Sequence, residues 1–429
     1  MSSTVIVILS FVGLMLVGMP LFAAVGLTAA IALYLIDIPL TLLAQTAFTS
    51  LQPFPLLTIP LFILAGKLME LGGMSSRMIS IAQTLVGAYR GSMAMVTIFA
   101  CALFAALSGS GPATTAAIGS ITIPEMKRQG YRARFAAAVS ASAGALGSMI
   151  PPSNLMIIYC LVAQESIPRM FLAGILPGFG VALLLLIVAY VVSAVNNYGG
   201  GGESFSIKPL MQALWDGKWA IFAPFIILGG IYSGVFTPTE AASVALFYSL
   251  FVGLFVYREL TWERIAESLR FTALLTGILI IIAPSFAFGQ IMALYDLPQT
   301  IEAGLSVIAA NPIIVMIIIG VILIIVGTFM ESLAQVVLFT PIFLPGVEAM
   351  GIDPLVFGIF MVMSCEIGFL TPPLGGNLFI AARLSNVSME QVSIGVLPLI
   401  LPYLAIMMLI VLVPTIVTFI PDLVYGPQP

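Results

Sequence analysis

The chain has 429 residues, of which 61% are hydrophobic and 7% are charged, whereas a soluble domain carries about 25% charged residues. Long apolar runs recur along the whole length, so we predict an all-α polytopic membrane protein. The net charge of −4 gives no nucleic-acid footprint, and the absence of histidine excludes a His-based proton relay or metal site.

The first half of the chain, residues 1–195, is predicted to contain two helical segments that are interrupted in the middle. In chain order we expect a hairpin at 3–18 and 21–36, a crossing at 54–72, a re-entrant hairpin at 92–126, a broken crossing at 135–164 and a crossing at 170–195. The sequence SGSGP at 108–112 interrupts the re-entrant hairpin, and IPPSN at 150–154 interrupts the broken crossing. Breaks at membrane depth are tolerated only where the backbone is buried or lines a polar cavity.

The second half, residues 219–429, is predicted to run the same course from the opposite side of the membrane. A polar cytoplasmic linker at 196–218 joins it to the first half. In chain order we expect a hairpin at 221–257, an amphipathic surface helix at 258–270 that braces the framework, a crossing at 271–295, a re-entrant hairpin at 311–347, a broken crossing at 354–385 and a crossing at 392–420. The breaks lie at 327–331 in the hairpin and at 371–377, TPPLGGN, in the broken crossing.

One constant spacing along the chain, called here the repeat spacing, relates the two halves. It is the distance in sequence from Gly147 to Gly368, and the same shift places Pro151-Pro152 on Pro372-Pro373. One topology puts the basic residues of the loops on the cytoplasmic side, with Arg169 as the exception, and leaves both termini outside. We therefore predict an inverted-topology repeat, a common build of secondary transporters.

The interrupted helices are predicted to form ligand sites near the membrane centre. Each break leaves unpaired carbonyl groups, which suit Na⁺, and unpaired N–H groups, which suit a carboxylate. We expect two symmetry-related cation sites, with the substrate between the two hairpin tips. The residues offered at these breaks are Ser108, Gly109, Ser110, Gly111, Thr114, Thr115 and Asn154 in the first half, and Thr328, Gly375, Gly376 and Asn377 in the second. Small residues also pack membrane helices tightly, so a packing role stays open for any one hydroxyl.

Three carboxylates, those of Glu240, Glu331 and Glu366, lie inside or near predicted spans. Acids in a membrane are candidates for function, and Glu331, at the second hairpin tip, could tune a cation site or carry a proton. Glu240 follows the sequence FTPT, which predicts that it caps the helix starting there. The direction in which Glu366 points stays open. No Lys or Arg is expected at the midplane, so an anionic substrate would rely on bound cations and helix N-termini.

The interrupted segments resemble a known family. The sequences SGSGPATTAAIGSITIPEMKRQGY, IPPSN, GVFTPTEAASVAL and TPPLGGNLF closely resemble the large membrane subunit of TRAP (tripartite ATP-independent periplasmic) transporters. The resemblance implies a multi-pass protein of the bacterial inner membrane with the fold of the ion-transporter superfamily. It also implies two partners, a small four-helix membrane subunit and a periplasmic substrate-binding protein. Uptake of an organic acid, of the C4-dicarboxylate, sialic acid or keto acid class, would be driven by sodium. The resemblance also implies an elevator mechanism, in which both hairpins and both broken crossings form a transport domain that slides against a scaffold.

The same resemblance assigns the site residues. It implies a first sodium site at Ser108, Gly109, Ser110, Pro151 and Asn154, and a second at Thr328, Glu331, Thr371, Gly375 and Asn377. Substrate contacts are expected at Ser110, Gly111, Thr114, Thr115, Ser153 and Gly376. No catalytic residue is expected, and no cofactor besides the coupling ion Na⁺, because the chain shows no nucleophile–base set or metal motif. Two other functions stay open: a stand-alone proton- or sodium-coupled permease, and an ion channel.

Overall fold

The computed structural model describes residues 3–87, 89–199, 206–295, 311–373 and 375–427. Within these ranges the secondary structure is helical, apart from an isolated bridge that pairs Arg90 with Gly199. Six helices of this described part are long and apolar enough to cross a membrane, or up to seven if one bent pair is a single span. These findings confirm the predicted all-α polytopic membrane fold.

The helices up to residue 195 follow the predicted order and add two short ones. They are α1 (Ser3–Leu16), α2 (Leu21–Leu35), α3 (Thr41–Thr49), α4 (Thr58–Leu71, preceded by a 3-10 turn at Phe54–Leu57), α5 (Met74–Val86), α6 (Ser92–Ser108), α7 (Gly111–Arg128), α8 (Ala133–Ala145, followed by a 3-10 turn at Leu146–Ser148), α9 (Asn154–Ala163) and α10 (Ile167–Val195). Two of them, α3 and α5, have no counterpart in the predicted order.

The helices after residue 195 also keep the predicted order. They are α11 (Ile207–Asp216), α12 (Lys218–Tyr232), α13 (Pro238–Phe251, continued by a π-helical turn at Val252–Val256), α14 (Trp262–Gly277, followed by a 3-10 turn at Ile278–Ile281), α15 (Ile282–Leu294), α17 (Pro312–Gly327), α18 (Ser332–Ala349), α19 (Pro354–Phe369), α20 (Gly376–Ser385), α21 (Met389–Leu412) and α22 (Thr415–Tyr425). Helix α11 lies inside the segment predicted as a linker. Pro414 separates α21 from α22, because proline has no N–H to continue the helix.

The amphipathic segment at 258–270 is not a separate surface helix. One helical run of 31 residues covers Trp262–Met292, and neither Gly nor Pro interrupts its first fifteen residues. Its polar side faces α4: the Arg264 guanidinium donates to the Leu71 carbonyl oxygen at 3.0 Å. The Lys67 ammonium lies 3.6 Å from the Glu267 carboxylate. The polar residues therefore brace α14 against α4.

The repeat spacing reappears in the helix bounds. It carries the first residue of α7 onto the first residue of α18, and the last residue of α7 onto the last residue of α18. It also carries the first residue of α8 onto the first residue of α19. Because Gly and Pro set helix ends locally, equal spacing of these residues produces equal helix bounds.

Helices α8 and α19 form the centre of the molecule. Every residue from Phe135 to Ala145 is buried, as is every residue from Leu355 to Gly368. Helices that are small and apolar on all sides are suited to full enclosure by other helices. Around them, α9 packs against α18 and α20 packs against α7. The second helix of each broken crossing therefore packs against the hairpin of the other half.

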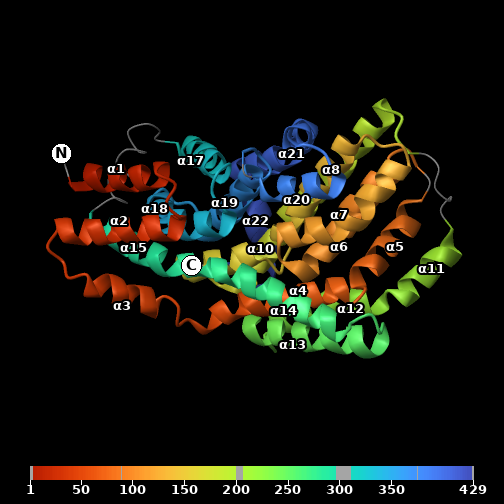
Figure 1. Ribbon diagram of the computed structural model, residues 1–429, viewed down its shortest axis with the longest axis horizontal. Helices are drawn as coiled ribbons and strands as arrows, with labels where there is room; N and C mark the ends of the chain where they lie inside the picture. Colours follow the sequence, from red (N-terminus) through yellow and green to blue (C-terminus); the bar gives the residue numbers. More distant parts are fainter. Residues whose placement is uncertain (1–2, 88, 200–205, 296–310, 374, 428–429) are drawn as a thin grey trace.

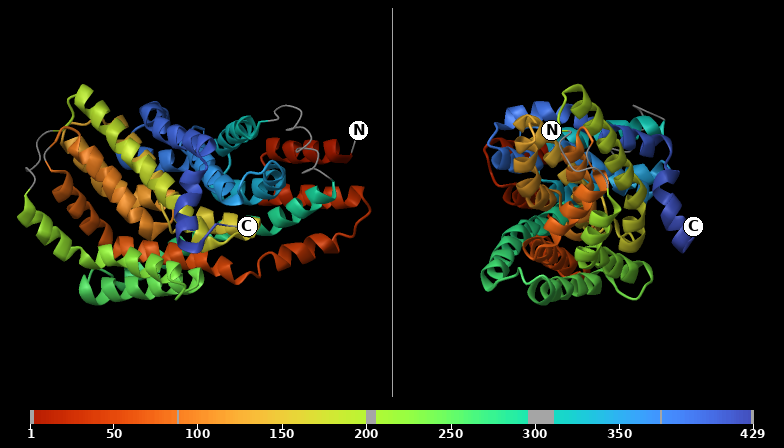
Figure 2. Two further views of the ribbon diagram at one scale, coloured as in Figure 1. Left: turned by 180° about the vertical axis from the view of Figure 1, so that it is seen from behind. Right: turned by 90° about the vertical axis from the view of Figure 1, so that its right-hand side faces the viewer.

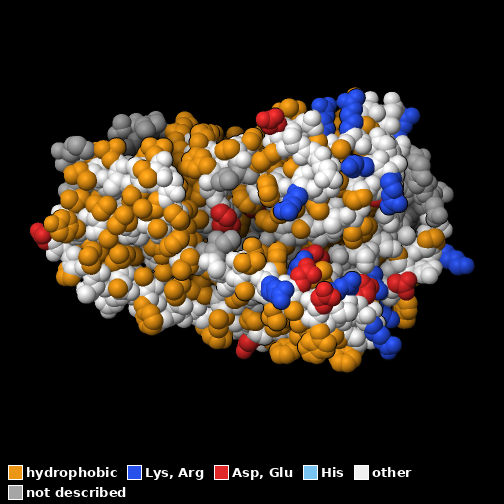
Figure 3. Space-filling model, in the orientation of Figure 1, with side chains coloured by type: hydrophobic (Ala, Val, Ile, Leu, Met, Phe, Trp, Pro, Cys, Tyr) orange, Lys and Arg blue, Asp and Glu red, His pale blue; other side chains and the backbone are white. Residues whose placement is uncertain are grey.

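A second group of helices lies along one side of this centre. Helices α12, α13 and α14 accompany α4 along the lower edge of Figure 1, and α2 and α3 pack on α15 at its left. The N-terminus lies at one end of the long axis, whereas the C-terminus lies near its middle (Figure 2). On the face shown in Figure 3, Lys and Arg side chains gather in the right half, while the left half is mainly hydrophobic.

Candidate functional site

The first hairpin is interrupted between Ser108, the last residue of α6, and Gly111, the first of α7. Gly109 takes a φ of 62°, in the left-handed region that favours glycine. A Cβ atom at Gly109 would lie 2.8 Å from the Pro152 carbonyl oxygen. The turn and the close approach of the broken crossing therefore both require glycine. Ser110 follows in an extended conformation.

The first broken crossing lies directly against this tip. The Asn154 N–H, at the start of α9, donates to the Gly109 carbonyl oxygen at 3.1 Å. Ser153 caps α9, because its hydroxyl accepts from the Met156 N–H at 3.4 Å, and it also donates to the Ser148 carbonyl oxygen at 2.5 Å. The Asn154 side-chain oxygen is buried without a hydrogen-bond partner among the described residues. It is therefore an available acceptor beside the tip.

The second hairpin is interrupted between α17 and α18. Glu331 precedes α18 as Ser110 precedes α7, and its carboxylate accepts from the Ala334 N–H at 3.2 Å. The Thr328 hydroxyl donates to the Ile325 carbonyl oxygen of its own helix at 2.8 Å. The acid at this tip thus caps the helix that follows it.

The second broken crossing separates α19 from α20. The Thr371 hydroxyl donates to the carbonyl oxygen four residues earlier at 2.8 Å, and Gly375 takes a φ of 42°. Asn377 is fully buried, and neither atom of its amide has a hydrogen-bond partner in the described part of the chain. The peptide bonds Pro151–Pro152 and Pro372–Pro373 are both cis.

The two halves meet at Gly111, the first residue of α7. The Gly111 N–H donates to the Ser148 hydroxyl at 2.9 Å. A Cβ atom at Gly111 would lie 3.2 Å from the Glu366 Oε2 atom and 3.1 Å from the Asn377 Nδ2 atom. Glu366 is 1% exposed, and its Oε1 atom accepts from the Ser332 hydroxyl at 3.5 Å. Acid and amide groups of the second half therefore surround the first hairpin tip.

A cavity of about 70 Å³ lies between the two tips. The polar residues that line it include Gly109, Ser110 and Asn154 from the first half and Glu331, Ser332 and Glu366 from the second. Two of its lining residues are acids, and none of the described lining residues is Lys or Arg. The cavity between the tips is thus lined by two acidic side chains, with no basic side chain among its described lining residues.

The remaining predicted site residues do not line this cavity. Among hydroxyls, Ser108 and Thr114 hydrogen-bond to each other at 2.6 Å, and Thr115 packs against Gly144. Gly376 lies against the Phe369 ring. The predicted residues outside the lining are Ser108, Gly111, Thr114, Thr115, Pro151, Ser153, Thr328, Thr371, Gly375, Gly376 and Asn377. Their ligand roles stay predictions.

Two serines at the site were not among the predicted residues. Ser148 links the first broken crossing to α7, and Ser332 links α18 to Glu366. The repeat spacing could have found Ser332, because it places Ser332 on Gly111. No local signal marks Ser148, since its contact depends on how the crossing packs against the hairpin.

Glu240 lies away from these breaks, in the cap of α13. The Thr237 N–H donates to the Glu240 carboxylate at 2.8 Å, and the Glu240 N–H donates to the Thr237 hydroxyl at 3.3 Å. This reciprocal capping box confirms the predicted capping role.

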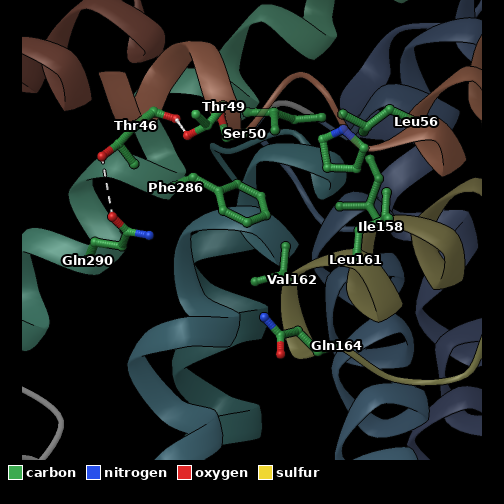
Figure 4. A pocket seen from close by; sticks show the side chains of 12 residues that line it. Thr46, Thr49, Ser50, Leu56, Ile158, Leu161, Val162, Gln164, Phe286 and Gln290 are labelled. Atoms are coloured by element: carbon green, nitrogen blue, oxygen red, sulfur yellow. Dashed lines mark hydrogen bonds between the residues drawn. The ribbon is translucent and has the colours of Figure 1, made fainter. Parts of the chain in front are cut away.

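A second pocket, of about 250 Å³, lies between α3, α15 and the end of α9 (Figure 4). The Thr46 hydroxyl donates to the Gln290 side-chain oxygen at 3.3 Å on its wall. The described lining residues carry no charge. Helix α9 lines both cavities, with Asn154 and Leu155 on the tip cavity and Ile158 and Leu161 on this pocket. The two cavities therefore follow one another along α9.

Comparison with known proteins places this architecture in a family. The family described as "Tripartite ATP-independent periplasmic transporter, DctM component" matches residues 8–416. The chain is 43% identical over 410 residues to the isethionate TRAP transporter permease protein DctMQ of Oleidesulfovibrio alaskensis, and the match covers 94% of this chain. It spans 64% of the length of that relative.

Two further relatives match over most of both chains. The C4-dicarboxylate TRAP transporter large permease protein DctM of Pseudomonas aeruginosa is 38% identical over 381 residues, covering 89% of each chain. The sialic acid TRAP transporter large permease protein SiaM of Vibrio cholerae is 33% identical over 421 residues, covering 98% of each.

A solved structure shares the fold. The YdaH transporter of Alcanivorax borkumensis matches with a TM-score of 0.60 and 14% identity, covering 96% of this chain and 98% of that one. At this identity the likeness shows the fold alone. The match to the family over most of the chain, together with these permease relatives, shows that the chain belongs to the DctM family, the large permease component of TRAP transporters, and is a transporter rather than an enzyme.

Proposed function

We propose that this chain is the transport subunit of a sodium-coupled, binding-protein-dependent importer of an organic acid. The relatives are named for isethionate, C4-dicarboxylate and sialic acid, which are all organic anions. We extend this class of substrate to the chain. A small membrane subunit and a periplasmic substrate-binding protein are the proposed partners, and the bacterial inner membrane, with both termini periplasmic, is the proposed location.

The cavity between the hairpin tips is the observation that carries this proposal. Glu331 and Glu366 already place two carboxylates there, and the described lining holds no basic side chain. An anionic substrate would bring negative charge next to these acids in a region of low dielectric, where an uncompensated charge is costly. Co-bound Na⁺ would compensate this charge, and the available Asn154 oxygen is the kind of ligand that hard cations prefer. Binding of the acid would then depend on binding of sodium, which is the basis of coupled transport.

The size of the cavity favours a mechanism in which the tips move. Its volume of about 70 Å³ is well below the roughly 300 Å³ or more of ordinary ligand pockets. The hairpins and broken crossings pack on one another across the two halves, α9 on α18 and α20 on α7. This packing across the two halves favours motion of four segments as one transport domain: 92–126, 135–164, 311–347 and 354–385. The other helices would form the scaffold of an elevator built from inverted repeats.

The proposal is tested by reconstituting the membrane complex in liposomes with candidate binding proteins under an inward sodium gradient. Accumulation of one acid that requires both sodium and a binding protein supports it. Uptake without any partner would point to a stand-alone permease, and conductance without coupling would point to a channel.

The first sodium site is tested by the double variant Ser108→Ala and Asn154→Ala. We expect it to raise the sodium concentration that gives half-maximal uptake, because two oxygen atoms beside the Gly109 turn are removed. Ser120→Ala, whose hydroxyl donates to the Ala117 carbonyl oxygen away from the break, is the matched control. An unchanged sodium response in the double variant would show that the first site is assigned wrongly.

A further inference from the structure

Helix α11, to which the proposed function gives no role, carries an exposed apolar stripe. Ile207, Met211 and Trp215 follow one another at intervals of four residues, so they lie along one side of the helix. Their exposed fractions are 69%, 60% and 69%, respectively. The helix packs against α5, and its buried residue, Ala213, lies on a different side. The stripe is therefore not the side by which the described part of the chain holds α11.

The polar residues of α11 lie directly beside this stripe. Lys208, Gln212 and Asp216 are each one position further along the helix, and all three are exposed. A helix whose exposed surface is apolar on one side and polar on the other fits the boundary between the acyl chains and the headgroups of a membrane. Trp215 suits the same level, because Trp side chains gather where a membrane meets water.

The connection to α12 makes the stripe continuous with surface that faces lipid. Helix α12 is apolar and exposes Phe222 and Phe225. A bend of 58° separates α11 from α12, so α11 does not continue the direction of this apolar helix. Helix α11 lies at the right-hand end of the molecule in Figure 1, in the half where Lys and Arg side chains gather on the face of Figure 3. This position favours a helix that lies on the membrane surface.

The charges around the stripe favour anionic lipid. Lys218, the first residue of α12, places its ammonium group 3.4 Å from the centre of the Trp215 ring. None of the ion pairs among the described residues includes Lys208 or Lys218, and the one acid of α11 is Asp216. Unpaired lysines at a membrane surface attract anionic headgroups. We propose that α11 lies on the membrane surface and that Lys208 and Lys218 bind the headgroups of anionic phospholipids there.

Quenching of Trp fluorescence by brominated lipids tests this location. Trp219→Phe together with Trp262→Phe leaves Trp215 as the only Trp of the chain. The full chain is placed in nanodiscs together with a Trp-free form of the small membrane subunit. We expect brominated phosphatidylglycerol to quench Trp215 about twofold more strongly than the same mole fraction of brominated phosphatidylcholine. Acrylamide, which is dissolved in water, should quench it weakly.

Lys208→Gln together with Lys218→Gln should abolish the preference for phosphatidylglycerol and leave quenching by phosphatidylcholine unchanged. Trp262, which is 85% exposed on α14, is the matched control. When Trp262 is the only Trp, the two lysine substitutions should not alter its quenching. Equal quenching of Trp215 by both lipids, a preference that survives loss of both lysines, or an equal loss of preference at Trp262 overturns the proposal. Quenching by acrylamide alone would place the stripe in water, and protection from every quencher would place it under another protein; either result overturns the proposal.

A second measurement keeps the test decisive if the chain with a single Trp does not fold. The three cysteines of the chain are buried, so a nitroxide label can be attached selectively at Met211→Cys. We expect this label to collide more often with oxygen, which dissolves in lipid, than with a water-soluble nickel complex. A label at Gln212→Cys, on the polar side, should show the opposite order, and the same order at both positions overturns the proposal. Neither measurement involves sodium or substrate, so failure of the proposed function and failure of this inference are distinguishable.

Discussion

Gly147 and Gly368 offer the sharpest test of how the broken crossings meet their hairpins. They are equivalent under the repeat spacing, and each comes shortly before the proline pair of its crossing. A Cβ atom at Gly147 would lie 2.5 Å from the Ser110 carbonyl oxygen, and one at Gly368 would lie 2.7 Å from the Gly327 Cα atom. Because both contacts are with backbone, they cannot be relieved by turning a side chain. Substitution by alanine must push each hairpin away from its crossing.

The expected cost follows from this geometry. Inserting a methyl group into a packed interior costs about 1–3 kcal/mol, so Gly147→Ala and Gly368→Ala should each lower the free energy of unfolding by that amount. Gly229 in α12 is the matched control, since a Cβ atom there would meet nothing within 4 Å. Gly229→Ala should leave stability unchanged or raise it by about 0.5–1 kcal/mol, the usual difference between alanine and glycine within a helix.

Unfolding of the three purified variants in the same detergent measures the effect, and a sodium titration of the folded proteins shows whether the tip is displaced. We expect Gly147→Ala also to weaken sodium-dependent stabilisation, because it pushes Ser110 away from the first broken crossing. Stability of Gly147→Ala and Gly368→Ala equal to that of Gly229→Ala would refute the inferred contact between hairpins and crossings.

Three further predictions concern other parts of the molecule. Thr237→Ala removes the cap of α13 and should cost about 1 kcal/mol; hydrogen exchange in the first turn of α13 checks this, and an unchanged rate would speak against it. Asp422→Asn weakens the ion pair that Asp422 forms with Arg169 at 2.7 Å, and because Asp422 is 35% exposed we expect a loss of about 1 kcal/mol or less. Limited proteolysis should then cut α22 faster, and an unchanged cleavage rate would show that other contacts hold it. Leu161→Trp fills the pocket shown in Figure 4; if substrate passes there, uptake slows while sodium-dependent stabilisation persists, and unchanged uptake would exclude that route.

The positions of the breaks could be predicted from the sequence because their causes are local. Gly109 and Gly375 take backbone conformations that favour glycine, and the proline pairs remove N–H groups from the helix. Equal spacing of such residues therefore indicated the repeated helix bounds before any contact was known. The capping box of Thr237 and Glu240 was predictable for the same reason, since its hydrogen bonds join groups that are close in sequence.

Helix α3 and the contact of the segment 258–270 with α4 could not be predicted from local sequence. Helix α3 buries only Thr46, and its apolar and polar residues follow no clear helical stripe. The segment at 258–270 is amphipathic, which is typical of a surface helix. Two of its charged residues, Arg264 and Glu267, instead contact α4, and this partner lies in the other half of the chain.

The sequence by itself determined the membrane class through its composition and the family through its motifs. It also determined the sites at which helices are interrupted, because Gly and Pro act on the backbone close to them in sequence. Only the tertiary structure decided which breaks meet. Asn377, predicted for the second sodium site together with Thr328, lies against Gly111 of the first hairpin. Helices α8 and α19 are apolar or small on nearly every side, so no stripe on them indicates a neighbour. Their partners are selected by close packing over the whole interior, which brings groups from distant parts of the chain to one cavity.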